Sequence, residues 1–288
     1  MNNRLSIIIP AYNEQKTVGS VVDDVKLILN KIKENYEIIV INDGSKDRTK
    51  EILEKIKGIK IINNPYNLGY GASIKKGIKE SEGDFLLIID ADGTYPVDAI
   101  PRLLEYSKSY DMVVGARVGE RVDIPFLRKP AKWFISKLAN FLSGKNIPDL
   151  NSGLRVFKRE VAEEFFHLFP SKFSFTTTLT LACLTNDYTV KYVPINYYRR
   201  KGSSTVHPIN DFISFITLIL RLATYFNPFK IFFLISASLL FFATVIFLYS
   251  LLFLERVMDI TVIIILMASL QIFLFGLLAE LMIKRVER

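Results

Sequence analysis

Residues 84–93 read DFLLIIDADG, an apolar run that leads directly into two aspartates. An apolar run of this length is typical of a buried β-strand, and we expect one over 84–89. Carboxylates at positions i and i+2 of a strand end are able to converge on one hard cation. Residues 84–93 therefore predict a buried strand with two cation-binding carboxylates, Asp90 and Asp92, at its carboxyl end.

Short apolar runs alternate with helical segments on both sides of this strand. Further strands are expected over 5–9, where Pro10 ends the run, and over 36–41, 59–62 and 112–114. Helices are expected over 14–33, from Ser45 or Asp47 to 57, and over 71–80 and 97–106. This alternation predicts an α/β fold with a mostly parallel central sheet that helices cover on both faces.

Polar side chains gather at the carboxyl ends of these strands, the edge where parallel sheets bind ligands. They are Asn13, Glu14, Asn42, Asp43, Asp90, Asp92 and Arg117. Asp43 suits a hydrogen bond from a nucleobase N–H, and Gly44 allows close approach of the backbone. A plain strand-to-helix turn explains these two residues equally well. The shared position of the strand ends predicts a ligand site at this edge.

The two carboxylates favour Mg²⁺ or Mn²⁺, which bind hard oxygen ligands and bridge to substrate phosphates. Aspartates also cap strand-end turns, so the pair alone leaves both interpretations open. Several other chemistries lack their motifs: the sequence has no G-x-G-x-x-G after its first strand, no P-loop, no G-x-S-x-G and no zinc-ligand spacing. His167 and His207 are isolated, which favours a surface or structural role for each.

The C-terminal part has a different composition. Hydrophobic residues make up 50% and charged residues 23% of the 288, which excludes a disordered chain and a disulfide-bonded mini-protein. Residues 231–254 and 260–279 contain no charge, and each run is long enough to cross a hydrocarbon core of roughly 30 Å. We expect spans over about 231–254 and 260–281; a hairpin buried in a large core is the alternative.

Basic residues flank the predicted hairpin. They are Lys230 before the first span and Lys284, Arg285 and Arg288 after the second, whereas the turn holds one, Arg256. By the positive-inside rule, both termini and residues 1–229 face the cytoplasm. We therefore expect a multi-pass protein of the cell membrane, or of the endoplasmic reticulum membrane in a eukaryote. The lone Cys183 and the missing signal peptide agree with this expectation.

The formal net charge of +8 suits an anionic membrane or a phosphorylated substrate. Nucleic acid is not expected, because no binding motif and no basic run with interleaved aromatic residues is present. Residues 129–143 fit a membrane-surface helix or a core helix, and 208–226 fit an amphipathic helix beside the bilayer. Small residues of the spans would let copies pack into a homo-oligomer through the hairpin: Ser236, Ala237, Ser238, Gly276 and Ala279.

Seven segments, in order, resemble those of family 2 glycosyltransferases, inverting enzymes with the GT-A fold. They are 8–14 (IIPAYNE), 40–45 (VINDGS), 67–71 (NLGYG), 90–93 (DADG), 114–117 (VGAR), 151–155 (NSGLR) and 199–203 (RRKGS). Within the family, the chain is most similar to polyprenyl-phosphate glycosyltransferases of the dolichyl-phosphate mannose synthase and glucosyltransferase type. The resemblance implies a GT-A catalytic domain over 1–206, a juxtamembrane helix over 207–229 and a transmembrane hairpin over 230–284.

The resemblance also implies roles for single residues. The residues implied for the nucleotide-sugar are Pro10, Ala11, Tyr12, Glu14, Asp43, Gly71, Asp90, Ala91, Asp92 and Arg199. Those implied for the lipid phosphate are Arg117, Arg128, Arg200 and Lys201. Asp90 and Asp92 would hold Mg²⁺ or Mn²⁺, and Asp92, Arg117 and Arg199 would be catalytic.

Two positions depart from the family pattern. Many relatives have a glutamine, a further metal ligand, two residues after the second aspartate, and this chain has Thr94. Many follow G-x-S with lysine, where this chain reaches Thr205. The third metal ligand and one phosphate contact are therefore in question, with Arg200, Lys201 and His207 as substitutes for the latter.

The resemblance, together with the strand-end carboxylates, the basic residues and the predicted membrane hairpin, implies inverting, metal-dependent transfer of one sugar from a UDP- or GDP-sugar to a polyprenyl phosphate, dolichyl or undecaprenyl. A lipid phosphate is already an anion at neutral pH and needs no strong base. The alternative is a sugar-hydroxyl acceptor in polysaccharide or glycolipid synthesis, with Asp149 as general base. A processive synthase is disfavoured because no Q-x-x-R-W motif surrounds the single Trp133. The intact D-x-D disfavours an inactive scaffold.

Overall fold

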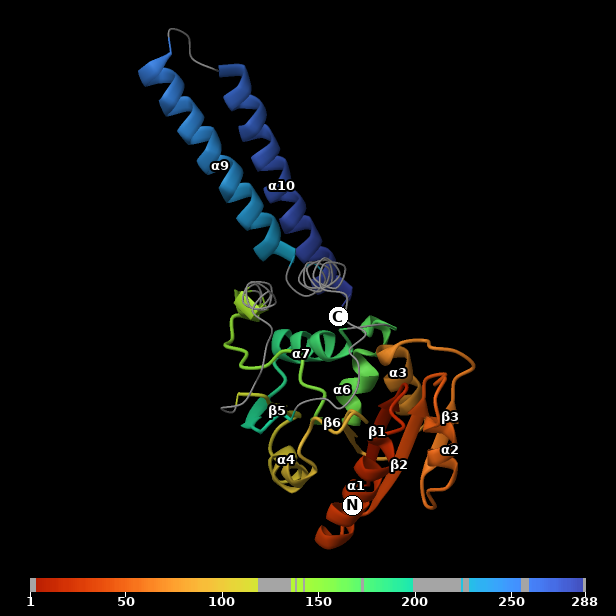
Figure 1. The fold of residues 1–288 in the computed structure, drawn as a ribbon. Helices are drawn as coiled ribbons and strands as arrows, with labels where there is room; N and C mark the ends of the chain where they lie inside the picture. The colour runs from red at the N-terminus through yellow and green to blue at the C-terminus, as the bar shows by residue number, and fades with distance from the viewer. Residues whose placement is uncertain are drawn as a thin grey trace. The chain divides into compact units, whose positions relative to one another are not determined.

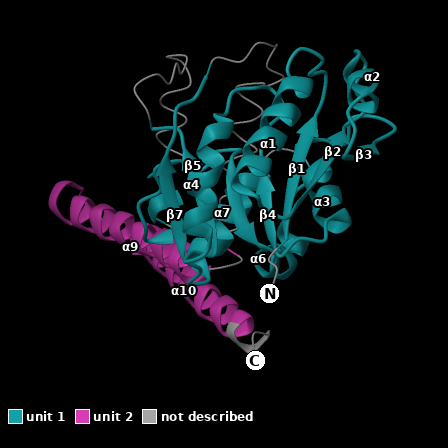
Figure 2. Ribbon diagram, turned by 90° about the horizontal axis from the view of Figure 1, so that it is seen from below, with its two compact units in different colours: residues 1–218 teal, residues 219–288 magenta. Residues whose placement is uncertain are grey.

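In a computed structural model of the chain, the described residues are 4–118, 136–137, 139–141, 143–171, 174–198, 224, 228–254 and 259–286. The chain divides into two compact units, residues 1–218 and residues 219–288, which are coloured separately in Figure 2. The predicted helices over 129–143 and 208–226 fall largely outside the described residues.

Within the described residues, the first unit contains a seven-stranded sheet with the order β3-β2-β1-β4-β6-β5-β7 (Figure 1). Its strands are β1 (Leu5–Ala11), β2 (Tyr36–Asn42), β3 (Lys60–Asn63), β4 (Phe85–Ile88), β5 (Met112–Ala116), β6 (Arg155–Lys158) and β7 (Val190–Pro194). Its pairs are parallel except those of β6 with β4 and β5. The predicted α/β fold with a mostly parallel sheet is confirmed.

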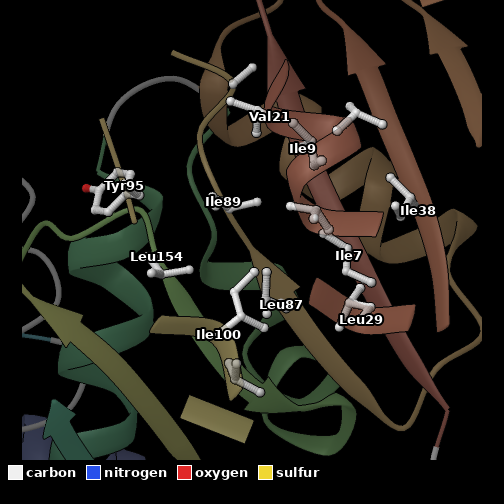
Figure 3. Close-up of a cluster of buried hydrophobic side chains, with 14 of the residues drawn as sticks. Ile7, Ile9, Val21, Leu29, Ile38, Leu87, Ile89, Tyr95, Ile100 and Leu154 are labelled. Carbon is white, nitrogen blue, oxygen red and sulfur yellow. The ribbon is translucent and has the colours of Figure 1, made fainter. Parts of the chain in front are cut away.

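The helices of this unit follow the strands in sequence. They are α1 (Val18–Ile32), α2 (Thr49–Glu54), α3 (Tyr70–Glu80), α4 (Ile100–Ser107), α6 (Arg159–Glu164) and α7 (Phe175–Thr185), with 3₁₀ turns η1 (Val97–Ala99) and η3 (Phe166–Leu168). On one face of the sheet, α1 and α4 bury apolar residues against alternate positions of β1 and β4. Figure 3 shows this core, with Val21 and Leu29 beside Ile7 and Ile9, and Ile100 beside Leu87.

The opposite face of β1 packs against α3. A Cβ placed on Gly77 would lie 2.6 Å from Cγ2 of Ile8 and 2.9 Å from Cδ1 of Ile41, so the absence of a side chain lets the helix approach the strands closely. All seven residues of β1 are buried. Burial on both faces explains why residues 7–11 of this strand form a continuous apolar run instead of an alternating one.

Some boundaries differ from the predictions. Strand β1 continues through Pro10 to Ala11, so the expectation that Pro10 ends it was wrong. The carbonyl of Ile8 accepts a hydrogen bond from Ile89 on the β4 side, and Pro10 faces the same side beyond the last pair with β4. Its missing N–H therefore costs no ladder hydrogen bond. Helix α1 begins at Val18 and not at Glu14, because Asn13 has φ +56° and a turn follows it.

The second unit consists, in its described part, of α9 (Pro228–Phe253) and α10 (Asp259–Val286). Both helices are long and apolar enough to cross a membrane. The buried residues of α9 are Pro228, Ser236, Ala243 and Ser250, while large side chains such as Phe241 and Leu252 are exposed. Small residues inside and large apolar residues outside suit a lipid environment and disfavour the alternative of a buried core hairpin.

The two helices pack against each other through small residues. The hydroxyl of Ser269 donates to the carbonyl oxygen of Ser236 at 2.9 Å, and the two serine hydroxyls lie 3.1 Å apart. A Cβ on Gly276 would lie 2.6 Å from Cβ of Phe232. Ser236 and Gly276, two of the residues predicted to pack between copies, thus pack within one hairpin. The homo-oligomer stays a prediction.

Candidate active site

The sheet brings the predicted strand-end residues to one edge. The register pairs Ala11 with Asn42 and Asn42 with Asn63, so the carboxyl ends of β1, β2 and β3 are level. Strand β6 runs the other way, which brings the loop before it, residues 149–154, to the ends of β4 and β5. That loop is therefore part of the site edge, beside the predicted residues.

The turns after β1 and β2 are tied together by polar contacts. The backbone N–H of Asn13 donates to the Ser45 hydroxyl at 3.0 Å, and the Asn13 side-chain oxygen accepts from the N–H of Lys46 at 2.8 Å. Glu14 is buried, and its carboxylate accepts a hydrogen bond from Thr17 at 3.2 Å. These contacts fix the segment that contains the half-buried Tyr12 and follows the buried Pro10 and Ala11.

Asp43 shapes the loop that leads into α3. Its Oδ1 accepts hydrogen bonds from the Asn64 side chain at 2.8 Å and the Leu68 N–H at 2.9 Å, and its Oδ2 accepts from the Gly69 N–H at 2.9 Å. Gly44, at φ +67°, lies so close to this loop that a Cβ would be 2.4 Å from the Tyr66 carbonyl carbon. A local structural role for Asp43 is thus established, and base binding stays a prediction.

The two aspartates after β4 are held by neutral donors. The Tyr70 hydroxyl, on the first residue of α3, donates to Oδ1 of Asp90 at 2.9 Å. Oδ1 of Asp92 accepts from the backbone N–H of Thr94 at 3.1 Å and from its hydroxyl at 2.6 Å. Thr94 is fully buried and points to Asp92. Thr94, in place of the family glutamine, thus orients one of the predicted metal ligands.

The donor set fits a hard divalent cation. Among the residues that the structure describes, no group of three His, Cys, Asp or Glu side chains is positioned to hold a metal. Mg²⁺ is usually bound through one or two carboxylates together with substrate phosphates and water. Asp90 and Asp92 therefore match an ion that substrate phosphates help to coordinate.

Arg117, which is partly buried, and Asp149, which is buried, form an ion pair beside the end of β5. Nε and NH2 of Arg117 donate to Oδ2 and Oδ1 of Asp149 at 2.7 and 2.9 Å, and the Arg117 backbone N–H donates to Oδ2 at 2.9 Å. The Asn151 N–H adds a fourth hydrogen bond at 3.2 Å. Burial raises the pKa of Asp149, but the bonds from Arg117 outweigh it and hold the pKa below its usual value.

The guanidinium of Arg117 also lies over the ring of Tyr197, 5.1 Å from its centroid. Tyr197 in turn packs edge-on against Tyr95, with 5.3 Å between ring centroids. The pair with Asp149 and the stack on Tyr197 leave the guanidinium in one orientation. A fixed, charged guanidinium of this kind is suited to binding a phosphate or carboxylate.

Hydrogen bonds with buried neighbouring groups hold the 149–154 loop in place. The N–H of Gly153 donates to the Tyr95 hydroxyl at 2.6 Å, and the Ser152 hydroxyl donates to the Gly115 carbonyl at 2.5 Å. Fully buried Arg155 donates through Nε to the Ser152 carbonyl at 3.0 Å. The sequence alone predicts no role for Tyr70, Tyr95, Gly153 or Tyr197. Tyr70 and Gly153 do lie in segments that resemble the family, which was the available signal.

For the remaining predicted site residues, the structure shows either burial alone or no position. Gly71 is buried in the first turn of α3, and Ala91 is buried between the two aspartates. Arg128, Arg199, Arg200 and Lys201 lie outside the described residues. The structure therefore brings together the predicted residues of β1, β2, β4 and β5, and the roles of these four basic residues stay predictions.

Comparisons with known proteins agree with this geometry. The profile of Glycosyl transferase family 2 matches residues 6–166. A dolichyl-phosphate hexose transferase of Haloferax volcanii is 28% identical over 206 residues, 71% of this chain and 87% of that protein. A dolichyl-phosphate beta-glucosyltransferase of Trichomonas vaginalis is 30% identical over 245 residues, covering 77% of this chain and 71% of that protein.

A solved structure has the same fold. Glucosyl-3-phosphoglycerate synthase from Mycobacterium tuberculosis, in complex with Mn²⁺, UDP-glucose and phosphoglyceric acid, gives a TM-score of 0.61 at 18% identity. The alignment covers 77% of this chain and 80% of that one. The family profile, the two relatives and the arrangement of the strand ends lead to one conclusion: the chain is a glycosyltransferase that belongs to glycosyl transferase family 2.

Proposed function

We propose that this enzyme transfers one sugar from a nucleotide-sugar to a polyprenyl phosphate, with inversion at the anomeric carbon. The observation that carries the proposal is the Arg117–Asp149 pair, in which the carboxylate accepts four hydrogen bonds from the chain itself. A hydroxyl acceptor needs a base to take its proton. A phosphate acceptor is already an anion and needs a cationic partner, which Arg117 supplies.

In the proposed reaction, an oxygen of the lipid phosphate attacks the anomeric carbon as the bond from that carbon to the nucleotide diphosphate breaks. The bonding electrons leave with the diphosphate, and no proton transfer is required at neutral pH. Arg117 would orient the lipid phosphate and reduce the repulsion between two anionic groups. Arg128, Arg199, Arg200 and Lys201 are proposed to add positive charge around the two phosphates.

Asp90 and Asp92 are proposed to hold Mg²⁺ or Mn²⁺. When bound, the ion neutralises charge on the diphosphate leaving group. The mycobacterial synthase that shares this fold was solved with Mn²⁺ and UDP-glucose, which supports both the ion and a nucleotide-sugar donor. The hydroxyls of Tyr70 and Thr94 orient these carboxylates, and as neutral donors they add no positive charge of their own.

The nucleotide is proposed to bind along the ends of β1, β2 and β4. The residues proposed for it are Pro10, Ala11, Tyr12, Glu14, Asp43, Gly71, Asp90, Ala91, Asp92 and Arg199. Asp43 already accepts three hydrogen bonds, but two carboxylate oxygens offer about four acceptor positions. A base N–H would take the remaining one, on Oδ2, which accepts only from Gly69 among the bonds described above.

The membrane arrangement is also a proposal. We propose a catalytic domain over 1–206, a juxtamembrane helix over 207–229 and a hairpin over 230–284 that spans the membrane twice. The basic residues at the hairpin ends favour a cytoplasmic position for both termini and for the catalytic domain. The site would then meet its lipid acceptor at the cytoplasmic face of the cell membrane, or of the endoplasmic reticulum in a eukaryote.

A donor screen tests the proposal. The full chain, purified in detergent, would receive radiolabelled UDP- and GDP-sugars, Mn²⁺ or Mg²⁺, and polyprenyl phosphates of dolichyl and undecaprenyl type. We expect chloroform-soluble label with at least one donor, and release of free sugar on mild acid treatment. Absence of a lipid-linked product with every donor and both carriers would refute the proposed function.

A further inference from the structure

Asp90 is clamped between two elements that are distant in sequence. On one side, the Tyr70 hydroxyl donates to Oδ1 at 2.9 Å from the first turn of α3. On the other side, the carboxylate lies directly on Gly153 of the 149–154 loop, where a Cβ would be 2.4 Å from Oδ2 and 2.7 Å from Cγ. The carboxylate therefore has little freedom to rotate or to withdraw.

From this clamp we propose that Tyr70 is a positioning residue for Asp90: its hydroxyl holds one carboxylate oxygen over Gly153 so that the group is preset for a divalent cation. The inference rests on the proposed function, because it assigns Asp90 to the metal of that reaction. Tyr70 itself touches neither substrate nor ion in this account and acts only through Asp90.

The chemistry of the contact supports this role. The Tyr70 phenol is a neutral hydroxyl at neutral pH and donates to Oδ1 of Asp90. A donor on one carboxylate oxygen fixes the rotamer without neutralising the charge. Residues that hold metal ligands in this way typically change metal affinity by about 10- to 100-fold when they are removed.

The identity of residue 94 gives Tyr70 added importance. In the family pattern a glutamine would supply a further ligand, but Thr94 donates to Asp92 instead. The described part of the site thus offers two carboxylates, and a hydroxyl donates to Oδ1 of each one. With few protein ligands, the geometry of each one has a larger effect on ion binding.

The test compares matched tyrosine variants. Tyr70→Phe removes the hydroxyl and keeps the ring, while Tyr36→Phe removes a hydroxyl that donates to Asn30 at 2.8 Å, at the opposite end of β2. Mn²⁺ binding to the full chain in detergent would be followed by electron paramagnetic resonance, with UDP and with GDP. We expect about 10-fold weaker Mn²⁺ binding for Tyr70→Phe and no change for Tyr36→Phe.

A second variant perturbs the same carboxylate from the other side. Gly153→Ala would place a methyl carbon 2.4 Å from Oδ2 of Asp90, too close for a non-bonded contact, so the carboxylate must move. We expect Gly153→Ala to bind Mn²⁺ more weakly as well. For Tyr70→Phe, we expect the KM for polyprenyl phosphate to stay within about 3-fold of that of the unaltered enzyme. Tyr70→Phe that binds Mn²⁺ as tightly as the unaltered chain, even with reduced thermal stability, would overturn the proposal.

The readout separates this inference from the proposed function. Mn²⁺ titration needs no turnover, so weaker binding by Tyr70→Phe in a chain that forms no lipid-linked sugar would support the clamp and refute the function. Formation of a lipid-linked sugar, together with equal Mn²⁺ affinity in both tyrosine variants, would support the proposed function and refute the positioning role of Tyr70. An unaltered chain that binds no Mn²⁺ with either nucleotide would overturn the clamp.

Discussion

Two neighbouring parts of the site edge hold their carboxylates in opposite ways. After β4, Asp90 and Asp92 accept hydrogen bonds from the hydroxyls of Tyr70 and Thr94. Beside the end of β5, Asp149 is bound by the guanidinium of Arg117. A neutral donor orients a carboxylate and leaves its charge in place, whereas a guanidinium compensates the charge. The first arrangement suits a cation, and the second presents an oriented arginine to an anion.

The largest effect is expected from removing charge on the β4 side. Asp92→Asn keeps the shape of the side chain and its bond from Thr94, but weakens cation binding. Loss of one such stabilising group typically costs about 10²–10³ in rate. Initial rates and Mn²⁺ titrations would be measured beside Asp98→Asn, an exposed aspartate in η1 that serves as control. Full activity in Asp92→Asn would contradict the metal role.

The next effect concerns the β5 side. Removing one partner of a fully buried ion pair typically costs about 3–5 kcal/mol, and the partial exposure of Arg117 lowers this value here. Asp149→Leu should therefore lower the free energy of unfolding by less than that and raise KM for polyprenyl phosphate. Lys158→Met breaks the more exposed pair with Asp111 and should cost about 1 kcal/mol or less. Denaturation of the detergent-solubilised chain measures both.

The pH dependence of this pair has a definite sign. The pKa of Asp149 is lower in the folded chain than its ordinary value, which is about 3.9 in an unfolded chain. The pair therefore stabilises the fold above that value, and the stabilisation is lost as the pH falls through the lower, folded pKa. The difference between the unaltered chain and Asp149→Leu should shrink below about pH 4. A constant difference down to pH 2 would show that Asp149 contributes by packing instead.

A smaller effect is expected at Thr94. Thr94→Val removes the hydroxyl donor to Asp92 and leaves the backbone donor at 3.1 Å, whereas Thr94→Ser keeps both. We expect about 10-fold weaker Mn²⁺ binding for the valine variant and near-normal binding for the serine variant. Equal affinities in the two variants would show that the hydroxyl has no part in orienting Asp92.

The smallest effect is expected at the loop that links the two sides. Tyr95→Phe removes the acceptor for the buried Gly153 N–H and should cost about 1–3 kcal/mol of stability. Because the loop carries both Asp149 and Gly153, Mn²⁺ affinity and KM for polyprenyl phosphate should shift together and only slightly. A large change in one alone would mean that the loop does not connect the two parts of the site.

The sequence was sufficient to predict most of the sheet. Strands β1, β2, β4 and β5 contain buried apolar runs followed by polar residues, a pattern that follows from burial on both faces, whereas the short edge strand β3 is only partly buried. Strand β6 escaped prediction because it is four residues long and begins with Arg155, whose charge argues against a core strand. Its guanidinium is nonetheless buried, since carbonyl and hydroxyl oxygens of Ser152, Thr176 and Thr180 accept from it.

Part of the site was also predictable from the sequence, because some of its residues come soon after predicted strands. Asp90, Asp92 and Arg117 come soon after the ends of strands β4 and β5 in the sequence. A parallel arrangement of these strands therefore places the three residues at one edge of the sheet. Asp149 lies 32 residues beyond Arg117, and their pairing depends on the antiparallel entry of β6. Asp149 is the general base predicted for a hydroxyl acceptor, but the four hydrogen bonds that it accepts favour a role in orienting Arg117. Pairings of this kind require the three-dimensional register.

One measurement tests the central claim most directly. The full chain, with the donor that gives product, would be offered polyprenyl phosphate and the matching polyprenol in parallel, at equal concentrations and at neutral pH. A site with an oriented arginine, in which the candidate base Asp149 is engaged by Arg117, should glycosylate the phosphate and leave the alcohol unmodified. Transfer to the polyprenol at a comparable rate, lost in Asp149→Asn, would contradict the account and identify Asp149 as a general base.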